Sequence, residues 1–325
     1  MQTTEVPGTG LAVSRLVLGT MNIGDTVDRD GAAAMLDAAA EAGITMIDTA
    51  NGYAGSRCEP ILGELLRSRP GRFDVASKVG IPHPDAGGAP PLSRKAIHAC
   101  VEGSLTRLGV EKLDVYYLHQ PDRATPIAET LETVAELADA GTIGALGVSN
   151  FAAWQIAELR HAAIAAGAPQ PVFSQPLYNL LARRIDEEYV EFSRTAGLFD
   201  IVYNPLGGGL LSGRHSFDAP PSDGRFGSSG LATMYRDRYW NEGLFRAVEA
   251  LSRVAADAGL PLPELALRWL VGRESVGAIL VGASKVEQLH ANVAAAERGP
   301  LPDDVVTACD AVWADLRGPV PAYNR

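Results

Sequence analysis

Asp48, Lys78 and His119 each follow a short apolar run of this 325-residue chain, and Tyr53 lies one short loop after Asp48. A tyrosine hydroxyl ordinarily has a pKa of about 10, and a nearby ammonium group lowers that pKa because it stabilises the phenolate. Asp48 would hold Lys78 charged, so that Tyr53 could act as a general acid. His119 could hydrogen-bond a substrate carbonyl oxygen and orient it. Because no side chain donates hydride, a bound cofactor would have to supply it.

The elements that would bring these residues together are short β-rich runs that alternate with Ala- and Leu-rich helical patterns. Strands are predicted at Leu16–Leu18, Thr45–Ile47, Phe73–Ser77, Leu113–Leu118, Ile143–Val148, Val172–Ser174, Asp200–Tyr203 and Ala278–Val281. Helices are predicted at 30–42, 57–68, 93–108, 126–140, 152–166, 184–196, 241–258 and 286–297, with Ser93 as an N-cap. Eight βα repeats predict an α/β fold, a closed (β/α)8 TIM barrel whose chemistry lies at the carboxyl ends of its strands.

The rival arrangement, a doubly wound sheet, would show G-x-G-x-x-G after its first strand. Gly8-Thr9-Gly10 precedes that strand and lacks the third glycine, which favours the barrel.

Three segments lie outside the repeat. Residues 4–14 predict a hairpin that closes the bottom of the barrel, and the Gly-, Ser- and Pro-rich residues 212–240 predict a long loop after strand 7, of the kind that often forms a lid. A last helix at 302–316 would precede the tail Gly318–Arg325, which we expect over the barrel top. With no interdomain linker in the sequence, we expect residues 1–325 to form a single barrel domain.

The composition excludes several classes of protein. There are 39 acidic residues against 28 Lys plus Arg, a formal charge of −11, which argues against nucleic-acid binding. No apolar run approaches the roughly 18–20 residues that span a bilayer, and the first ten residues carry no base, so neither membrane insertion nor a secretory signal is expected. Cys58, Cys100 and Cys309 are odd in number and scattered, which indicates free thiols in a reducing cytoplasm.

The motifs around these residues resemble the aldo-keto reductase superfamily over essentially the whole chain. They are Leu16-x-Leu18-Gly19-Thr20-Met21, Ile47-Asp48-Thr49-Ala50 with Tyr53, Ser77-Lys78, Leu113-Asp114 through His119, Gly147-Val148-Ser149-Asn150-Phe151, Gln175, Tyr203-Asn204-Pro205-Leu206 and Gly282-Ala283-Ser284. The resemblance implies that Asp48, Tyr53, Lys78 and His119 are the catalytic tetrad of that family.

A finer resemblance points to the aflatoxin-aldehyde and succinic-semialdehyde reductase branch. It rests on Gln120-Pro121-Asp122 with Thr125-Pro126, the glycine-rich run 203–213, Arg225-Phe226-Gly227, Arg238-Tyr239-Trp240 and the Arg-terminated tail. In that branch, positions matching Arg238 and Arg325 meet a substrate carboxylate, while Tyr53 and His119 would meet the carbonyl. The tail differs from the branch pattern in the residue after Pro321 and in the residue before Arg325.

The resemblance also implies a nicotinamide dinucleotide held across the barrel top, NADPH rather than NADH. Ser149, Asn150 and Gln175 match the residues that bind the carboxamide, and Tyr203 matches the aromatic that stacks on the nicotinamide ring. The full set of matching cofactor positions is Thr20, Met21, Asp48, Ser149, Asn150, Gln175, Tyr203, Asn204, Pro205, Leu206, Gly207, Gly209, Leu211, Arg225, Gly282, Ser284, Lys285, Gln288 and Asn292.

Two departures bear on the choice of cofactor. Ala291 stands where the family usually has Glu, which weakens the adenine end of the site. Lys285 stands where the family often has Arg, so a 2′-phosphate would meet a point charge rather than a bidentate fork. Placed beside Ser284 at a predicted helix start, Lys285 could still bind that phosphate.

The leading function is NADPH-dependent reduction of aldehydes or ketones to alcohols. Two alternatives stay open, a ketoreductase of a sugar or natural-product pathway and a cofactor-binding regulatory subunit with slow turnover. No metal is expected, because no metal-binding spacing is found among the histidines His83, His98, His161, His215 and His290, which are interpreted as incidental. A monomer or homodimer is expected. Trp154 and Trp269 fall on helical patterns and are predicted to pack in the interior.

Overall fold

The computed structural model describes residues 1–219 and 221–321. These residues fall into two compact units. The first consists of Met1–Pro176, Ile185–Val202 and Ser275–His290, and the second of Leu177–Arg184, Tyr203–Glu274 and the chain from Ala291 onward. Each unit is described by itself.

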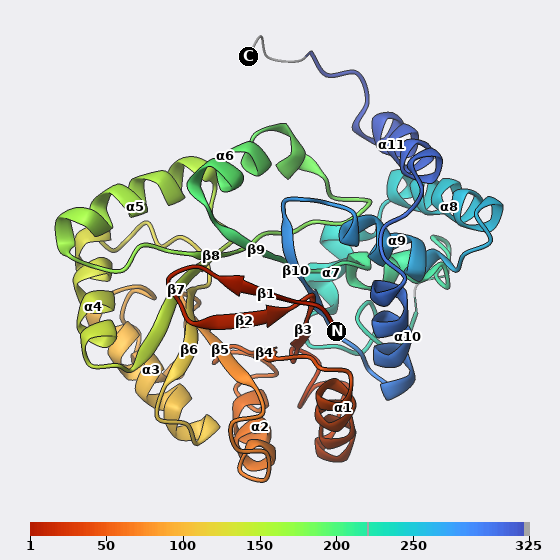
Figure 1. The fold of residues 1–325 in the computed structure, drawn as a ribbon. Helices are drawn as coiled ribbons and strands as arrows, with labels where there is room; N and C mark the ends of the chain where they lie inside the picture. The colour runs from red at the N-terminus through yellow and green to blue at the C-terminus, as the bar shows by residue number, and fades with distance from the viewer. Residues whose placement is uncertain (220, 322–325) are drawn as a thin grey trace. The chain divides into compact units, whose positions relative to one another are not determined.

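The first unit contains a closed barrel of parallel strands (Figure 1). The strands are β3 (Leu16–Gly19), β4 (Met46–Asp48), β5 (Asp74–Val79), β6 (Leu113–Leu118), β7 (Ile143–Ser149), β8 (Phe173–Gln175), β9 (Phe199–Val202) and β10 (Val276–Val281). They pair in chain order and β10 returns to β3, with Ile279 opposite Leu16. The prediction of a TIM barrel is therefore confirmed.

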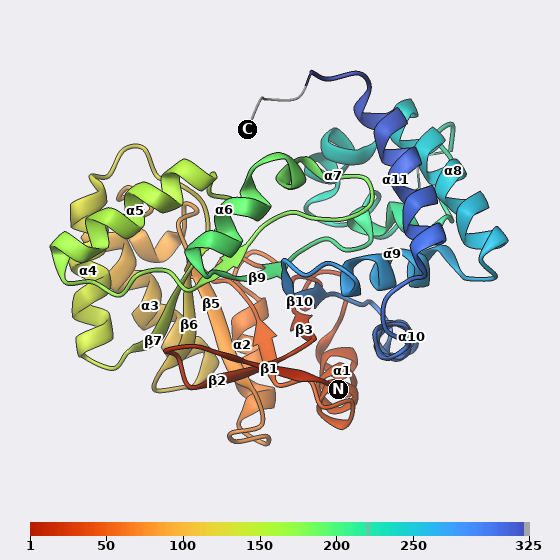
Figure 2. The same cartoon turned by 45° about the horizontal axis from the view of Figure 1, so that its top comes forward.

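Helices cover the outside of this barrel (Figures 1 and 2). They are α1 (Arg29–Glu41), α2 (Cys58–Leu66), α3 (Arg94–Leu108), α4 (Ile127–Asp139), α5 (Ala153–Ala166) and α6 (Tyr189–Ala196), and α10 (Val286–Glu297) begins in this unit. In α3 the Ser93 side chain accepts a hydrogen bond from Ala96 N–H, as predicted, and Gly109 ends the helix in the left-handed conformation that glycine favours. Short 3₁₀ turns lie at Pro84–Ala86 (η1) and Arg184–Glu187 (η2).

The N-terminal hairpin was predicted correctly. Strands β1 (Thr3–Val6) and β2 (Leu11–Ser14) pair antiparallel, and Figure 1 shows them in front of the barrel strands. Val6 and Val13 join a buried cluster that includes Val17 and Met46 near the amino-terminal ends of the barrel strands. The hairpin thus fills the end of the barrel opposite the predicted chemistry.

The second unit is more helical than the sequence indicates. It contains the 3₁₀ turn η3 (Gly207–Ser212) and the helices α7 (Ala232–Tyr239), α8 (Glu242–Asp257), α9 (Leu262–Val271) and α11 (Asp303–Arg317). Residues 212–240, predicted as loop, therefore include a helix, and Phe226 packs there against Tyr235 and Trp240 with ring centroids 6.3 and 5.2 Å away. Helix α9 contains Trp269, which was placed on a helical pattern, but its bounds were not predicted.

Of three other local predictions, the one for Trp269 is confirmed, and those for Trp154 and for the helix at 184–196 differ from the structure. Trp269 is 1% exposed and packs against Tyr178, with ring centroids 5.0 Å apart, as expected. Trp154 is 63% exposed, so its interpretation as a packing residue is wrong. The helix predicted at 184–196 is divided into η2 and α6, because Glu188 leaves the helical region at φ −150°.

Free cysteines and the lack of a membrane-spanning segment were both predicted from the sequence. Cys58, Cys100 and Cys309 are free and buried. Within residues 1–219 and 221–321, no helix combines the length and the apolar character needed to cross a bilayer.

Candidate active site

Lys78 is the centre of a buried polar group inside the first unit. Its side chain is fully buried, and its Nζ donates to Asp48 Oδ1, to Thr49 O at 2.7 Å and to Tyr53 Oη at 3.0 Å. The ring of Tyr53 meets the ring of His119 edge to face, with centroids 6.1 Å apart. The structure thus brings together all four residues predicted to form the tetrad.

The barrel explains why these residues meet. Asp48 ends β4, Lys78 lies near the end of β5, and His119 directly follows β6, so neighbouring strands place them at one edge. His119 N–H donates to Val79 O at 2.7 Å, which extends the β5–β6 pairing by one residue. Tyr53 comes from the loop between β4 and α2.

The electrostatics of the group favour a charged lysine beside a neutral histidine. Burial opposes the charge on Lys78, but Asp48 and Tyr53 outweigh it and raise the pKa of the ammonium group. Burial, together with the charge on Lys78, lowers the pKa of His119 to about 3. His119 is therefore neutral near pH 7 and keeps one ring N–H to donate.

A second set of polar side chains adjoins the tetrad. Gln175 Nε2 donates to Asp48 Oδ2 at 2.8 Å, and Ser149 Oγ donates to the carbonyl oxygen of Gln175 at 3.0 Å. Asn150, which takes the left-handed φ of 60°, donates from Nδ2 to His119 O at 2.9 Å and to Ser149 Oγ at 3.1 Å. The residues predicted to bind a carboxamide are therefore hydrogen-bonded to the tetrad itself.

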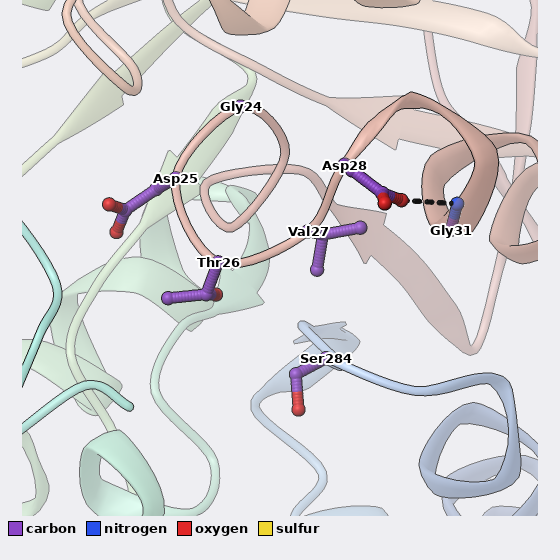
Figure 3. A pocket seen from close by; sticks show the side chains of 7 residues that line it. All are labelled: Gly24, Asp25, Thr26, Val27, Asp28, Gly31 and Ser284. Atoms are coloured by element: carbon purple, nitrogen blue, oxygen red, sulfur yellow. Dashed lines mark hydrogen bonds between the residues drawn. The ribbon is translucent and has the colours of Figure 1, made fainter. Parts of the chain in front are cut away.

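The predicted phosphate-binding residues lie at the start of α10. Ser284 donates from N and Oγ to Gln288 Oε1, at 2.9 and 3.0 Å, while Asn22 Nδ2 donates to Ala283 O. Ser284 also lines a cavity of about 410 Å³, together with Gly24, Asp25, Thr26, Val27, Asp28 and Gly31. In Figure 3 the loop from Gly24 to Asp28 lies opposite Ser284. The Asp28 side chain caps α1, because its Oδ1 accepts a hydrogen bond from Gly31 N–H at 2.8 Å. Lys285, which follows Ser284, is exposed.

Three further predicted cofactor positions lie in the first unit, namely Thr20, Met21 and Gly282. Thr20 is buried and donates from Oγ1 to Asp48 O at 2.9 Å. Met21 is half-buried and Gly282 is exposed.

The second unit holds its own predicted residues around Tyr235. Tyr235 Oη donates to Asn204 Oδ1 at 3.2 Å and accepts from Arg225 Nη1 at 3.1 Å. The Arg225 guanidinium lies 4.8 Å from the centre of this ring and that of Arg238 lies 6.0 Å from it. Burial raises the pKa of the neighbouring Tyr203, and the charge of Arg238 opposes that change.

The remaining predicted positions of this unit are placed as follows. Arg238 is exposed and lines a cavity of about 690 Å³ with Gly230, Leu231, Thr233, Met234 and Asp237. Asn292 is buried in α10. Pro205 and Leu206 precede η3, which contains Gly207, Gly209 and Leu211. Arg325 lies outside the described residues.

Sequence reasoning missed several residues next to these groups. Tyr117 lies below Lys78, with Nζ 5.8 Å from the centre of its ring, and its inward position follows from the alternation of β6. Gly208 has φ 69°, and a Cβ there would lie 2.6 Å from Tyr235 Cδ1, so only glycine lets this turn approach the ring. His83, interpreted as incidental, is buried and hydrogen-bonded to Ser56 in the Tyr53 loop.

Comparisons with known proteins agree with this geometry. Residues 15–314 match the Aldo/keto reductase family. The chain is 34% identical over 324 residues to aflatoxin B1 aldehyde reductase member 2 of Rattus norvegicus, which covers 95% of this chain and 87% of that protein. It is 36% identical over 325 residues to aldo-keto reductase family 7 member A3 of Homo sapiens, with 95% and 96% covered. It is also 31% identical over 313 residues to a probable voltage-gated potassium channel subunit beta of Arabidopsis thaliana, with 94% of each chain covered.

Proposed function

The chain belongs to the aldo/keto reductase family, and from that premise we propose that it reduces aldehydes with NADPH and uses Tyr53 as the proton donor. At the level of the family, it is an NAD(P)H-dependent oxidoreductase of the aflatoxin aldehyde reductase branch and acts on small carbonyl compounds. The observation that carries the finer proposal is the pair of contacts that Lys78 Nζ makes with Asp48 and with the Tyr53 hydroxyl.

Tyr53 and His119 would act together on the carbonyl oxygen. The neutral His119 ring donates a hydrogen bond to that oxygen, and Tyr53 Oη transfers its proton to it as the carbon is reduced. The Lys78 ammonium group, 3.0 Å from Oη, then stabilises the phenolate that remains. Asp48 and the carbonyl oxygen of Thr49 hold the ammonium group in place.

The residues present fit a nicotinamide dinucleotide. When bound, it would supply the hydride that reduces the carbonyl carbon. Ser149, Asn150 and Gln175 form a connected set of amide and hydroxyl groups against the tetrad, suited to a carboxamide. Ser284 and Lys285 lie at a helix start beside a cavity, suited to a phosphate. In the second unit, the buried Nδ2 of Asn204 has no hydrogen-bond partner among the described residues, which favours a ligand group there.

NADPH is the preferred cofactor in this proposal because Lys285 adds a positive charge at that helix start. The remaining cofactor positions of the second unit, Tyr203 and Arg225 among them, are proposed from the family resemblance. So is the role of Arg238 and Arg325 in recognising an acidic substituent. A cytoplasmic location and a monomer or homodimer stay predictions.

One experiment tests this function. Consumption of NADPH and of NADH is measured with succinic semialdehyde, 4-nitrobenzaldehyde, a keto sugar and no substrate. The proposal expects rapid turnover of aldehydes with NADPH and a preference for the acid-bearing aldehyde. Reduction of the keto sugar alone would favour the ketoreductase instead.

A second candidate, a cofactor-binding regulatory subunit, is favoured by the similarity to the probable channel subunit. It predicts tight NADPH binding with less than about one turnover per second on every carbonyl tested, below the usual range for enzymes.

A further inference from the structure

The loop that carries Tyr53 has an unusual backbone. Ala54, Gly55 and Ser56 have φ values of 52°, 63° and 69° in succession. Two of these residues have side chains, and the left-handed region is unfavourable for a residue other than glycine. Such a conformation persists only where the surrounding structure holds it, so the contacts that hold this loop also determine where the Tyr53 hydroxyl lies.

One side chain from outside the loop meets it at this point. His83, in the segment after β5, has a side chain only 3% exposed, and its Nε2 lies 2.8 Å from Ser56 Oγ. Its Nδ1 accepts a hydrogen bond from Asp85 N–H at 3.2 Å. Nδ1 also lies 3.2 Å from Asp85 Oδ2. The ring therefore joins Ser56 Oγ, through Nε2, to Asp85, through Nδ1.

The histidine is itself held by a network that runs behind the tetrad. Asp85 Oδ2 accepts from Arg107 Nη1 at 2.8 Å, and Arg107 Nε donates to Glu59 Oε2 at 2.9 Å. Glu59 is fully buried, and its Oε1 accepts from Ser77 Oγ at 2.7 Å. Since Ser77 precedes Lys78 in β5, the network joins the loop of the proton donor to the strand of its lysine.

The same cluster could be mistaken for a metal site, because ligand atoms of His83, Asp85 and Cys100 lie within 4.8 Å of one another. Its atoms are already engaged. Asp85 Oδ2 takes the guanidinium of Arg107, whose positive charge opposes a cation, and both ring nitrogens of His83 have partners. Burial, and next the charge of Asp85, raise the pKa of the Cys100 thiol to about 11, so it stays protonated.

We propose that His83 is a positioning residue that fixes the Tyr53 hydroxyl against Lys78 by holding Ser56. This role rests on the proposed function of Tyr53 as proton donor. Loss of the hydrogen bond between Nε2 and Ser56 Oγ would release the loop from its left-handed turn, and Tyr53 would spend less time within reach of Lys78 and of the carbonyl oxygen. The effect should fall on kcat, because the residues proposed to bind the carboxamide and the phosphate of the cofactor lie on other elements than this loop.

Two substitutions separate the two ring nitrogens. In His83→Gln the amide nitrogen reaches the place of Nε2 and can still donate to Ser56. In His83→Asn the side-chain oxygen replaces Nδ1 as the acceptor for Asp85 N–H, and the contact with Ser56 is lost. We expect His83→Asn to lower kcat for an aldehyde by about 10- to 100-fold, as for a misplaced catalytic group, with little change in the Kd of NADPH. His83→Gln should restore most of that turnover, and His161→Asn, at an exposed position on α5, serves as the matched control.

Three measurements accompany the kinetics, namely wild-type aldehyde turnover, the Tm of each variant and calorimetric titration of wild type with Zn²⁺. Equal kcat losses in the Asn and Gln variants, tracking their Tm, would overturn the positioning role in favour of a general structural one. Stoichiometric Zn²⁺ binding that both variants abolish would overturn it in favour of a metal site. A wild type without aldehyde turnover would overturn the proposed function and this role with it, whereas an active wild type with undiminished His83→Asn overturns this role alone.

Discussion

Two layers of side chains inside the barrel lie two residues apart along the strands, and one layer is apolar whereas the other is polar. The pairs are Met46 and Asp48, Ala76 and Lys78, and Tyr117 and His119. The first member of each pair belongs to the buried apolar cluster that the hairpin closes, and the second belongs to the tetrad. Because alternate residues of a strand face the same side, one barrel wall positions both layers.

The difference shows how the polar layer is tolerated. The apolar layer is stabilised by the removal of its surface from water, whereas charge is retained in the polar layer because its members are paired. Asp48 uses Oδ1 for Lys78 and Oδ2 for Gln175. Substitutions in the polar layer should therefore abolish activity, and substitutions in the apolar layer should cost stability alone.

Lys78→Met should have the largest effect, because it should lower both kcat and the free energy of unfolding. Removing the ammonium group should lower kcat by roughly 10²–10⁴-fold, because Tyr53 loses its charge partner. It should also lower the free energy of unfolding by about 3–5 kcal/mol, since Asp48 is left buried without a cation. Steady-state kinetics and urea denaturation measure the two effects.

The double variant Asp48→Asn with Lys78→Met provides the control. It removes both charges and should recover most of the stability without recovering activity. Recovery of both, or of neither, would contradict the view that these charges serve catalysis at a cost to the fold.

Met46→Ala tests the apolar layer two residues away. Met46 is fully buried, and its truncation should lower the free energy of unfolding by about 2–5 kcal/mol. The kcat of the folded enzyme should stay near that of wild type. Ile164→Ala, at a position 68% exposed, is the matched control and should change stability by less than about 0.5 kcal/mol. A large loss of kcat in Met46→Ala would show that the two layers are not separable.

Asp200 in β9 can be compared with Asp48, because it is a buried carboxyl group that is held by hydroxyl groups, whereas Asp48 is paired with the ammonium group of Lys78. Burial raises its pKa to about 7, while hydrogen bonds from Ser193 and Ser174 oppose that rise. The unfolded value lies near 3.9, so between about pH 4 and pH 7 the folded state binds more protons than the unfolded state. Stability from this group therefore falls as pH rises through that window and stays low above it.

Asp200→Asn should remove that dependence. Relative to wild type, the variant should gain on the order of a few kcal/mol between pH 5 and pH 8 in urea unfolding experiments. A constant difference between the two proteins across this range would mean that Asp200 does not titrate as its surroundings indicate.

Lys285→Ala should have the smallest effect, confined to one cofactor. A charge-assisted contact with a 2′-phosphate contributes about 1.5–3 kcal/mol, so the Kd of NADPH should rise roughly 10- to 100-fold. NADH, which lacks that phosphate, should be affected little. Fluorescence titration with both cofactors measures the difference, and equal losses would reject a phosphate-binding role for Lys285.

Features of the fold and of the site that depend on local sequence could be predicted. Asp48 and Lys78 are recognisable because each interrupts or ends an apolar run, and Ser93 because it precedes a helical period. The bounds of helix α9 were not predicted, although Trp269 was placed on a helical pattern. Pro261 and Pro263 resemble helix breakers, but proline is tolerated at a helix start, where its missing N–H is not needed. Trp154 was misplaced because a large aromatic at a helical position gives no indication of which face is covered.

The role of His83 lay beyond such reasoning. Its partner Ser56 is 27 residues earlier in the chain, and their contact depends on three consecutive left-handed residues. None of those conformations follows from composition or periodicity, because Ala54 and Ser56 have no intrinsic preference for them. A residue that acts through the backbone of a distant loop becomes visible only in three dimensions.

Tyr53→Phe tests the central claim most directly, because it removes one oxygen and leaves the ring in place. The rate of aldehyde reduction is measured under single-turnover conditions, and the Kd of NADPH is measured by fluorescence on the same preparation. If Tyr53 is the proton donor, the rate of reduction should fall about 10²–10⁴-fold while the Kd of NADPH stays nearly unchanged. Retention of more than about a tenth of the wild-type rate would contradict it, because a general acid of this kind contributes far more than tenfold.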